Sequence, residues 1–188
     1  MKRSFETVLV EQCAPTLAGV KPANLFCYQS QNRAQIYDIV NNWNKQLYPF
    51  GLALCIVKEC CKTNSFLIYL YRRQQMDQIF SKQENQIFLM QMGYQLTDCD
   101  SLIHQLSARL CFEKEFPHEI GIFLGYPLID VIGFIEHKGQ NYSCAGYWKS
   151  YGDSIHAKKL FELYKKCISH YRQMYKIGIP ILQLVTAA

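Results

Sequence analysis

The sequence has no run of about 20 apolar residues, the length that a membrane-spanning helix requires. Its N-terminal segment also lacks a signal-peptide core, because Glu6 and Glu11 bracket only a short apolar run. Long basic tracts are missing as well, and the net charge of +5 is spread along the chain instead of forming a nucleic-acid-binding stripe. We therefore expect a cytoplasmic protein that binds neither a membrane nor a nucleic acid.

Cysteine pairs at metal-binding or redox spacing are also missing, because none of the nine cysteines belongs to a C-x-x-C motif. Their odd number, and their positions within apolar segments, indicate reduced thiols rather than a disulfide framework. Cys60 and Cys61 would point to opposite faces of a strand, so they are poor joint ligands for one metal ion. We expect no structural metal site, and the sequence identifies no cofactor.

Charged residues make up only 19% of the sequence and apolar residues 49%, which excludes a disordered tail and a highly charged coiled coil. No internal repeat, low-complexity segment or linker divides the 188 residues. We therefore expect a single domain, spanning residues 1–188, with a sizeable core.

Helical and strand-like segments alternate along the chain, which predicts an α/β fold. Two β-rich runs within residues 52–71, separated by a short polar connection, predict a β-hairpin. Apolar residues recur at helical spacing in residues 33–47 and again after Asp153, which can cap a long helix. The last apolar segment, residues 179–185, is expected to form an edge strand or a docking tail, because Pro180 cannot donate to a sheet.

Residues 116–151 hold the densest mixture of glycine, aromatic and titratable side chains. Ile120–Leu124 is apolar at successive positions, which is typical of a strand covered on both faces. Pro127 predicts the start of a helix, and Tyr142–Lys149 a second strand. Residues 119–149 thus predict a β-α-β unit with parallel strands. Together with the hairpin, this unit predicts a mixed sheet of five or six strands with flanking helices.

A ligand site is expected where the two strands of this unit end, at Gly125 and Tyr126 and at Lys149 and Tyr151. Open α/β sheets bind ligands outside the carboxyl ends of their strands, and a helix N-terminus there favours an anion. Lys21 would add a donor if its loop folded over this edge. The alternative interpretation is that these side chains serve ordinary turn, core-edge and solvated roles.

A second group lies at the starts of the same predicted strands: His118 and Glu119 on the first, Cys144 on the second. Cys144 and His118 suggest the nucleophile pair of a thiol enzyme. A structural role is favoured, with Glu119 paired to an arginine such as Arg109 or Arg72, because His118 and Glu119 would point to opposite faces of a strand. At about 3.3 Å per residue, a strand would place the two groups roughly 20 Å apart.

Four sequence blocks together resemble a known family: CAPTLAGVKPANLF (13–26), FLIYLYR (66–72), FPHEIGIFLGYPLIDVIGFIEHKG (116–139) and GYWKSYGD (146–153). The chain is similar over nearly its whole length to a domain-of-unknown-function family found in anaerobic Firmicutes such as clostridia. The resemblance carries over no activity, ligand or catalytic residue. It points toward iron or redox physiology, because genes of this family lie near ferrous-iron transport and flavodoxin genes.

Three functions are compatible with these observations. The preferred hypothesis is the binding of a small anionic or cofactor-like ligand near Tyr126 and Lys149. One alternative is a hydrolase or transferase that depends on Cys144 and His118. The other is a protein-interaction module that docks through residues 177–185. The oligomeric state is left open by the sequence.

Overall fold

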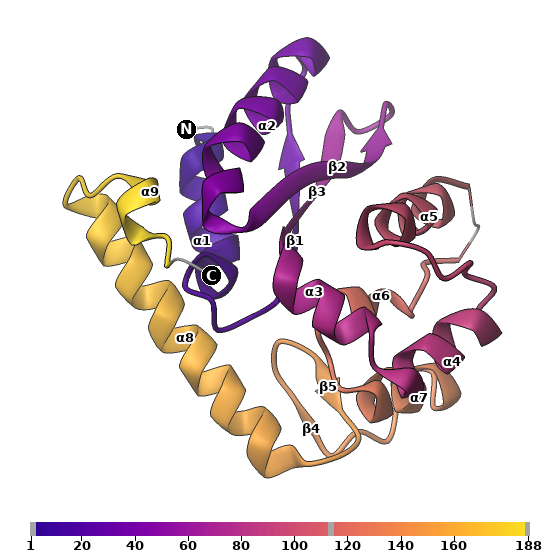
Figure 1. Cartoon of the computed structure of the whole chain (residues 1–188). Helices are drawn as coiled ribbons and strands as arrows, with labels where there is room; N and C mark the ends of the chain where they lie inside the picture. Colours follow the sequence, from indigo (N-terminus) through magenta and orange to yellow (C-terminus); the bar gives the residue numbers. More distant parts are fainter. Residues whose placement is uncertain (1–2, 113–114, 187–188) are drawn as a thin grey trace.

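The computed structural model describes residues 3–112 and 115–186, and its centre is a three-stranded antiparallel sheet between two layers of helices (Figure 1). The strands are β1 (Ala23–Gln29), β2 (Leu52–Cys60) and β3 (Ser65–Arg72), and β3 lies in the middle, paired with both neighbours. The predicted hairpin is therefore confirmed as β2 and β3.

Both faces of the sheet are covered because its central strand is apolar on both sides. Phe66, Ile68 and Leu70 of β3 enter one core, whereas Tyr69 and Tyr71 enter the other. This alternation follows from the two-residue period of a strand. The result is a single α/β domain in which the sheet separates two hydrophobic cores.

The helices divide between these two cores. The first core is covered by α1 (Phe5–Leu17), α2 (Arg33–Leu47), the 3-10 helix η1 (Tyr48–Phe50), α8 (Ser154–Lys176) and α9 (Ile181–Leu184). The second is covered by α3 (Arg73–Phe80), α4 (Gln83–Gln91), α5 (Cys99–Phe112), α6 (Ile120–Phe123) and α7 (Leu128–Glu136). The long helix α8 runs along α1 on the outside of the domain (Figure 1). Within the described residues, no helix is both long and apolar enough to cross a membrane.

The predicted β-α-β unit at residues 119–149 is wrong, and the sheet is not mixed. Ile120–Leu124 forms the short helix α6, and Tyr142–Lys149 contributes to a small antiparallel hairpin of β4 (Cys144–Ala145) and β5 (Lys149–Ser150). A short apolar run does not reveal by its periodicity whether it is a buried strand or a buried helical turn. The helical turn is formed here with Gly121 against Val131, a contact too close for a side chain.

The predicted edge strand at residues 179–185 is also wrong. This segment contains α9, and its side chains Ile181 and Val185 are buried in the first core. The Tyr171 hydroxyl donates a hydrogen bond to the Leu184 carbonyl at 2.6 Å. The tail therefore packs on its own domain, so the interaction-module hypothesis loses the surface that motivated it.

Arg72, at the end of β3, ties the sheet to α1 and to the C-terminal segment. It is buried, and its guanidinium donates to the carbonyls of Thr16, Leu17 and Thr186 at 2.7–2.8 Å. Two of these carbonyls belong to the last turn of α1, where helix carbonyls lack intrahelical partners. The cation also lies at the negative end of the α1 dipole.

Replacing Arg72 with Met should lower the free energy of unfolding by about 3 kcal/mol, because three carbonyls, two of them in buried hydrogen bonds, lose the guanidinium as a donor. Urea denaturation followed by circular dichroism measures this change. The matched control is Arg33→Met, since Arg33 is an exposed partner of Glu59 and its loss should have a much smaller effect on stability. Equal losses in the two variants would contradict a special role for Arg72.

Candidate functional site

The turn between α6 and α7 places Tyr126 at the centre of the candidate site. Gly125 has a φ of 74°, a left-handed conformation that a side chain rarely adopts, and its backbone N–H donates to Ile122. A Cβ on Gly125 would lie 2.6 Å from Pro22. Gly125 is therefore required by the turn, and its role is to direct Tyr126 toward the β4–β5 hairpin and the loop before β1.

Tyr126 is held on several sides. Its ring stacks on Trp148 with centroids 4.9 Å apart, and its hydroxyl donates to the Tyr147 carbonyl at 3.3 Å. The ammonium of Lys21 lies 5.3 Å from the ring centroid. The sequence predicted that Lys21 and Tyr126 would share a site, and the fold does bring these two side chains together.

Asp130, in the first turn of α7, fixes the hairpin that carries Trp148. Its Oδ2 accepts a hydrogen bond from the Trp148 indole at 2.7 Å. Its Oδ1 accepts from the Ser150 hydroxyl and from the backbone N–H groups of Tyr151 and Gly152 at 2.7–3.1 Å. The carboxylate is 3% exposed, so these four donors replace water around it.

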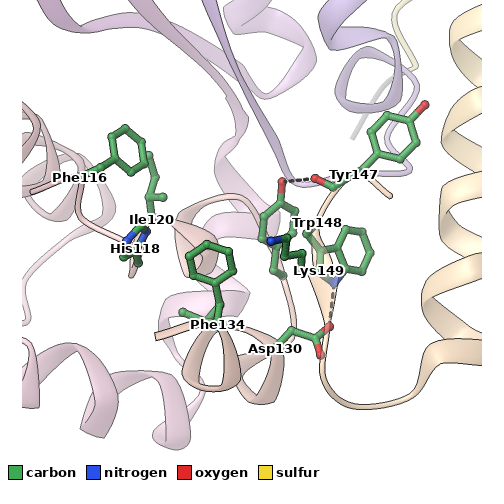
Figure 2. Close-up of a pocket in the computed structure, with 11 residues that line it drawn as sticks. Phe116, His118, Ile120, Asp130, Phe134, Tyr147, Trp148 and Lys149 are labelled. Carbon is green, nitrogen blue, oxygen red and sulfur yellow. Dashed lines mark hydrogen bonds between the residues drawn. The ribbon is translucent and has the colours of Figure 1, made fainter. Parts of the chain in front are cut away.

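A pocket of about 210 Å³ lies beside this network (Figure 2). It is mainly aromatic, and we call it the aromatic pocket; its walls include Phe116, His118, Tyr126, Phe134, Trp148 and Lys149. The expected separation of about 20 Å between the His118 and Tyr126 groups is wrong, because α6 takes the place of the strand that was to separate them.

Lys149 and Tyr151 are poor ligand-binding candidates in this fold. The ammonium of Lys149 donates to the Gly139 carbonyl at 2.6 Å, just beyond the end of α7, and lies 4.9 Å from the Tyr142 ring centroid. Tyr151 packs on α7 at Gly133 and stacks on His137, away from the aromatic pocket. Both side chains therefore make packing contacts within the protein, although the buried Tyr151 hydroxyl has no hydrogen-bond partner among the described residues.

The proposed thiol pair is not assembled. The Cys144 thiol donates to the Ser154 carbonyl at 3.8 Å and packs in a small cluster under α8. His118 instead lies 4.9 Å from the Phe134 ring. Glu119 is buried and pairs with Arg109 at 3.4 Å, so its predicted structural pairing is confirmed.

Lys21 lies in a second cavity, of about 200 Å³, on the other side of Tyr126. We call it the Lys21 cavity; its walls include Glu11, Lys21, Asn24, Tyr126, Tyr147 and Tyr164. These side chains come from α1, β1, the β4–β5 hairpin, α8 and the connections between them. Figure 2 shows the Tyr147 ring directed away from His118 and Phe134, so that Tyr147 faces this second cavity.

The Lys21 cavity holds three polar donors without hydrogen-bond partners among the described residues. Lys21 is 4% exposed, yet its ammonium has no hydrogen bond or ion pair with any described residue. The same holds for the hydroxyl of the buried Tyr164 and the side-chain NH₂ of Asn24, whose carbonyl oxygen accepts from Thr16. Three donors of this kind around a small cavity are suited to an acceptor-rich ligand.

Burial has a clear effect on the titration of these groups. It lowers the pKa of Lys21 from 10.5 to about 8, because the charged form loses its hydration. Burial raises the pKa of the neighbouring Cys13 thiol, so this thiol stays neutral and supplies no counter-charge. Burial also raises the pKa of Tyr164 to about 12, which keeps its hydroxyl protonated. The cavity therefore presents donors and a cation, and the carboxylate in its wall, Glu11, is paired with Arg3 and Arg172.

A larger groove of about 620 Å³ adjoins the cavity, and both are lined by Glu11, Gln12, Tyr147 and Ile168. Its outer wall is α8, which contributes Lys165, Arg172 and Lys176. These positions are separated by seven and four residues, so they share one helix face. The charge of Glu11 is offset by Arg3 at 2.6 Å and Arg172 at 3.8 Å. We call this surface the cationic groove.

Sequence reasoning missed the parts of this site that come from distant segments. Asp130 resembled an ordinary acidic residue of a helix start, and no local pattern connects it to Trp148. Tyr164 was expected in a core, and nothing in the sequence indicated a cavity beside it. No group of three or more potential metal ligands occurs within residues 3–112 and 115–186.

Asp130→Ala should lower the free energy of unfolding by about 3 kcal/mol or more, because four donors lose a charged acceptor. In a Trp43→Phe background, the Trp148 emission should also shift to the red as the indole gains access to water. Asp38→Ala, on the exposed face of α2, is the control and should change stability by less than about 0.5 kcal/mol. An unchanged emission maximum in Asp130→Ala would contradict the proposed anchoring of Trp148.

Comparison with known proteins gives a family but no functional relative. Neither the curated proteins nor the solved structures contain a match to this chain. A family model described as "Protein of unknown function (DUF3793)" matches residues 9–185, which include the residues of both cavities named above. The resemblance to a family of unknown function is thereby confirmed, and the chain belongs to the DUF3793 family.

Proposed function

We propose that this protein binds a small anionic ligand in the Lys21 cavity. The observation that carries the proposal is the buried Lys21 ammonium, which lacks a carboxylate or hydrogen-bonding partner within the part of the chain that the structure describes. A buried charge without a partner costs several kcal/mol. A ligand that brings the missing negative charge would recover part of that free energy on binding.

Nearby protein groups compensate Lys21 only in part. The cation–π contact with Tyr126 has a centroid distance of 5.3 Å, and such contacts contribute about 0.5–2 kcal/mol. The lowered pKa corresponds to a penalty of about 3 kcal/mol for the charged amine. The imbalance supports a role for Lys21 in binding rather than in stability.

The size and charge of the site indicate the class of ligand. At about 200 Å³, the cavity is smaller than the roughly 300–1,000 Å³ of sites for drug-sized compounds. A short carboxylate or a phosphate suits this volume better than an intact flavin or haem. The cationic groove would raise the local concentration of such anions at the cavity entrance.

The alternatives have less support. A thiol enzyme would need Cys144 and His118 in contact, and they have separate packing partners. The links to anaerobic Firmicutes, to iron or redox physiology and to the cytoplasm stay predictions, as does the absence of nucleic-acid and membrane partners.

Acetate, malonate and inorganic phosphate are suitable probes, titrated by calorimetry in a low-chloride buffer. At least one should bind at pH 7, and its affinity should fall about tenfold per pH unit above pH 8, where free Lys21 loses its proton. Lys21→Met should abolish binding, whereas the exposed-site control Lys62→Met should not. Failure of all three probes to bind, or equal binding to Lys21→Met, would overturn the proposal.

Lys21→Met should also raise the free energy of unfolding at pH 7, by about 1–3 kcal/mol. The pKa of Lys21 is lower in the folded state, about 8, than its ordinary value of 10.5. The unfolded chain therefore binds the extra proton between these values, and wild-type stability rises with pH across this window. The advantage of the variant should consequently shrink between pH 7 and pH 10, as measured by denaturation of both proteins. A variant less stable than wild type at pH 7 would show that the ammonium has a structural role.

A further inference from the structure

The Lys21 cavity combines a buried amine with a route for carboxylates, and this pairing suggests covalent chemistry. Resting on the anion-binding function proposed above, we propose that Lys21 forms an imine with a small 2-oxo carboxylate held in the cavity. The ligand's carboxylate would be bound by the unpartnered side-chain NH₂ of Asn24, while its carbonyl carbon meets the Lys21 nitrogen and its carbonyl oxygen faces the Tyr164 hydroxyl.

The first requirement is a nucleophilic nitrogen. No described residue forms a hydrogen bond with the Lys21 amine, so its lone pair is free whenever the group is neutral. At pH 7 a pKa of about 8 leaves about a tenth of the amine neutral, against about 0.03% for a lysine with the ordinary value. Desolvation in an apolar setting is an established way to activate lysine for this reaction.

The second requirement is a proton donor for the carbonyl oxygen. Tyr164 lines the same cavity, and burial keeps its hydroxyl protonated with a pKa of about 12. The nitrogen lone pair forms the new C–N bond, and the carbonyl oxygen takes a proton from this hydroxyl. The phenolate then recovers a proton from the nitrogen, and the same exchange releases the oxygen as water. One amine and one carbonyl thus give one imine and one water, with no change in oxidation state.

The third requirement is selectivity for a charged carbonyl compound. The cationic groove adjoins the cavity along Glu11, Gln12, Tyr147 and Ile168, so an anion attracted by α8 is led to the cavity entrance. A volume of about 200 Å³ restricts the compound to a few non-hydrogen atoms. A short 2-oxo acid satisfies both conditions, because its carboxylate is attached directly to the electrophilic carbon.

Lys149 and Lys62 lack this combination. Lys149 is partly buried, but its ammonium donates a hydrogen bond to the Gly139 carbonyl at 2.6 Å, so its nitrogen is held by the protein. Lys62 is exposed in the turn between β2 and β3. These two residues serve as internal references for reactivity in the same protein.

Incubation of the full chain with pyruvate and sodium cyanoborohydride, followed by peptide mass spectrometry, tests the proposal. The reductant converts any imine into a stable secondary amine. Trapping at Lys21 should be at least about tenfold faster than at Lys62 or Lys149 at pH 7. Acetate, which has the charge but no carbonyl, should slow trapping at Lys21 and leave the reference lysines unchanged.

Lys21→Arg keeps the positive charge but cannot form an imine, and Lys21→Gln removes both properties. Pyruvate binding measured by calorimetry should persist in Lys21→Arg and disappear in Lys21→Gln, while neither variant gives an adduct at residue 21. Pyruvate binding to wild type without trapping at Lys21 would overturn the imine and leave the anion site intact. Trapping at equal rates on all lysines would also overturn it. Absence of binding by pyruvate and by the simple anions would overturn the site itself.

Discussion

The carboxylate of Asp130 is the interaction on which the geometry of both cavities depends. It accepts four hydrogen bonds from the β4–β5 hairpin and the segment that follows, and it receives none from an arginine or lysine. Its place in the first turn of α7 adds the favourable field of a helix N-terminus. The hairpin has only two residues per strand, too few to be stable by itself, so this carboxylate sets its position.

A chain of contacts transmits that position to the ligand site. Asp130 holds Trp148, Trp148 stacks on Tyr126, and Tyr126 forms a wall of both the aromatic pocket and the Lys21 cavity. Asp130 and Lys21 lie at the two ends of this series of contacts, and both are buried charges with different surroundings. Asp130 is surrounded by donors, whereas Lys21 has no acceptor among the described residues. The same fold thus satisfies one charge for structure and leaves the other available for a ligand.

The parts of the fold with a clear local signal were predictable from the sequence. Residues 52–71 have the pattern of a hairpin, residues 33–47 form the predicted helix, and Asp153 caps a helix at the expected place. Residues 120–124 were mispredicted because five apolar residues fit a buried strand and a buried helical turn equally well. That error placed His118 and Tyr126 far apart, whereas they line one pocket.

The candidate site was predictable only in part for the same reason. Lys21 and Tyr126 were identified from turn chemistry, but their partners Asn24 and Tyr164 reach the cavity from β1 and α8. Such convergence depends on how α8 packs against α1, which no local pattern encodes. Asp130 was missed because a carboxylate near a helix start is usually solvated, and its four donors lie 18–22 residues away in the sequence.

Arg72 also has a consequence for folding of the chain during its synthesis. Its guanidinium donates hydrogen bonds to the carbonyls of Thr16 and Leu17 and to that of Thr186, which lies 114 residues after Arg72. During synthesis, α1 and β3 leave the ribosome long before Thr186 does. Until then the Arg72 guanidinium lacks its hydrogen bond to the Thr186 carbonyl. The first core, which includes Ile181 and Val185, is therefore incomplete until the C-terminal segment has emerged, and the domain should reach its full stability only after that point.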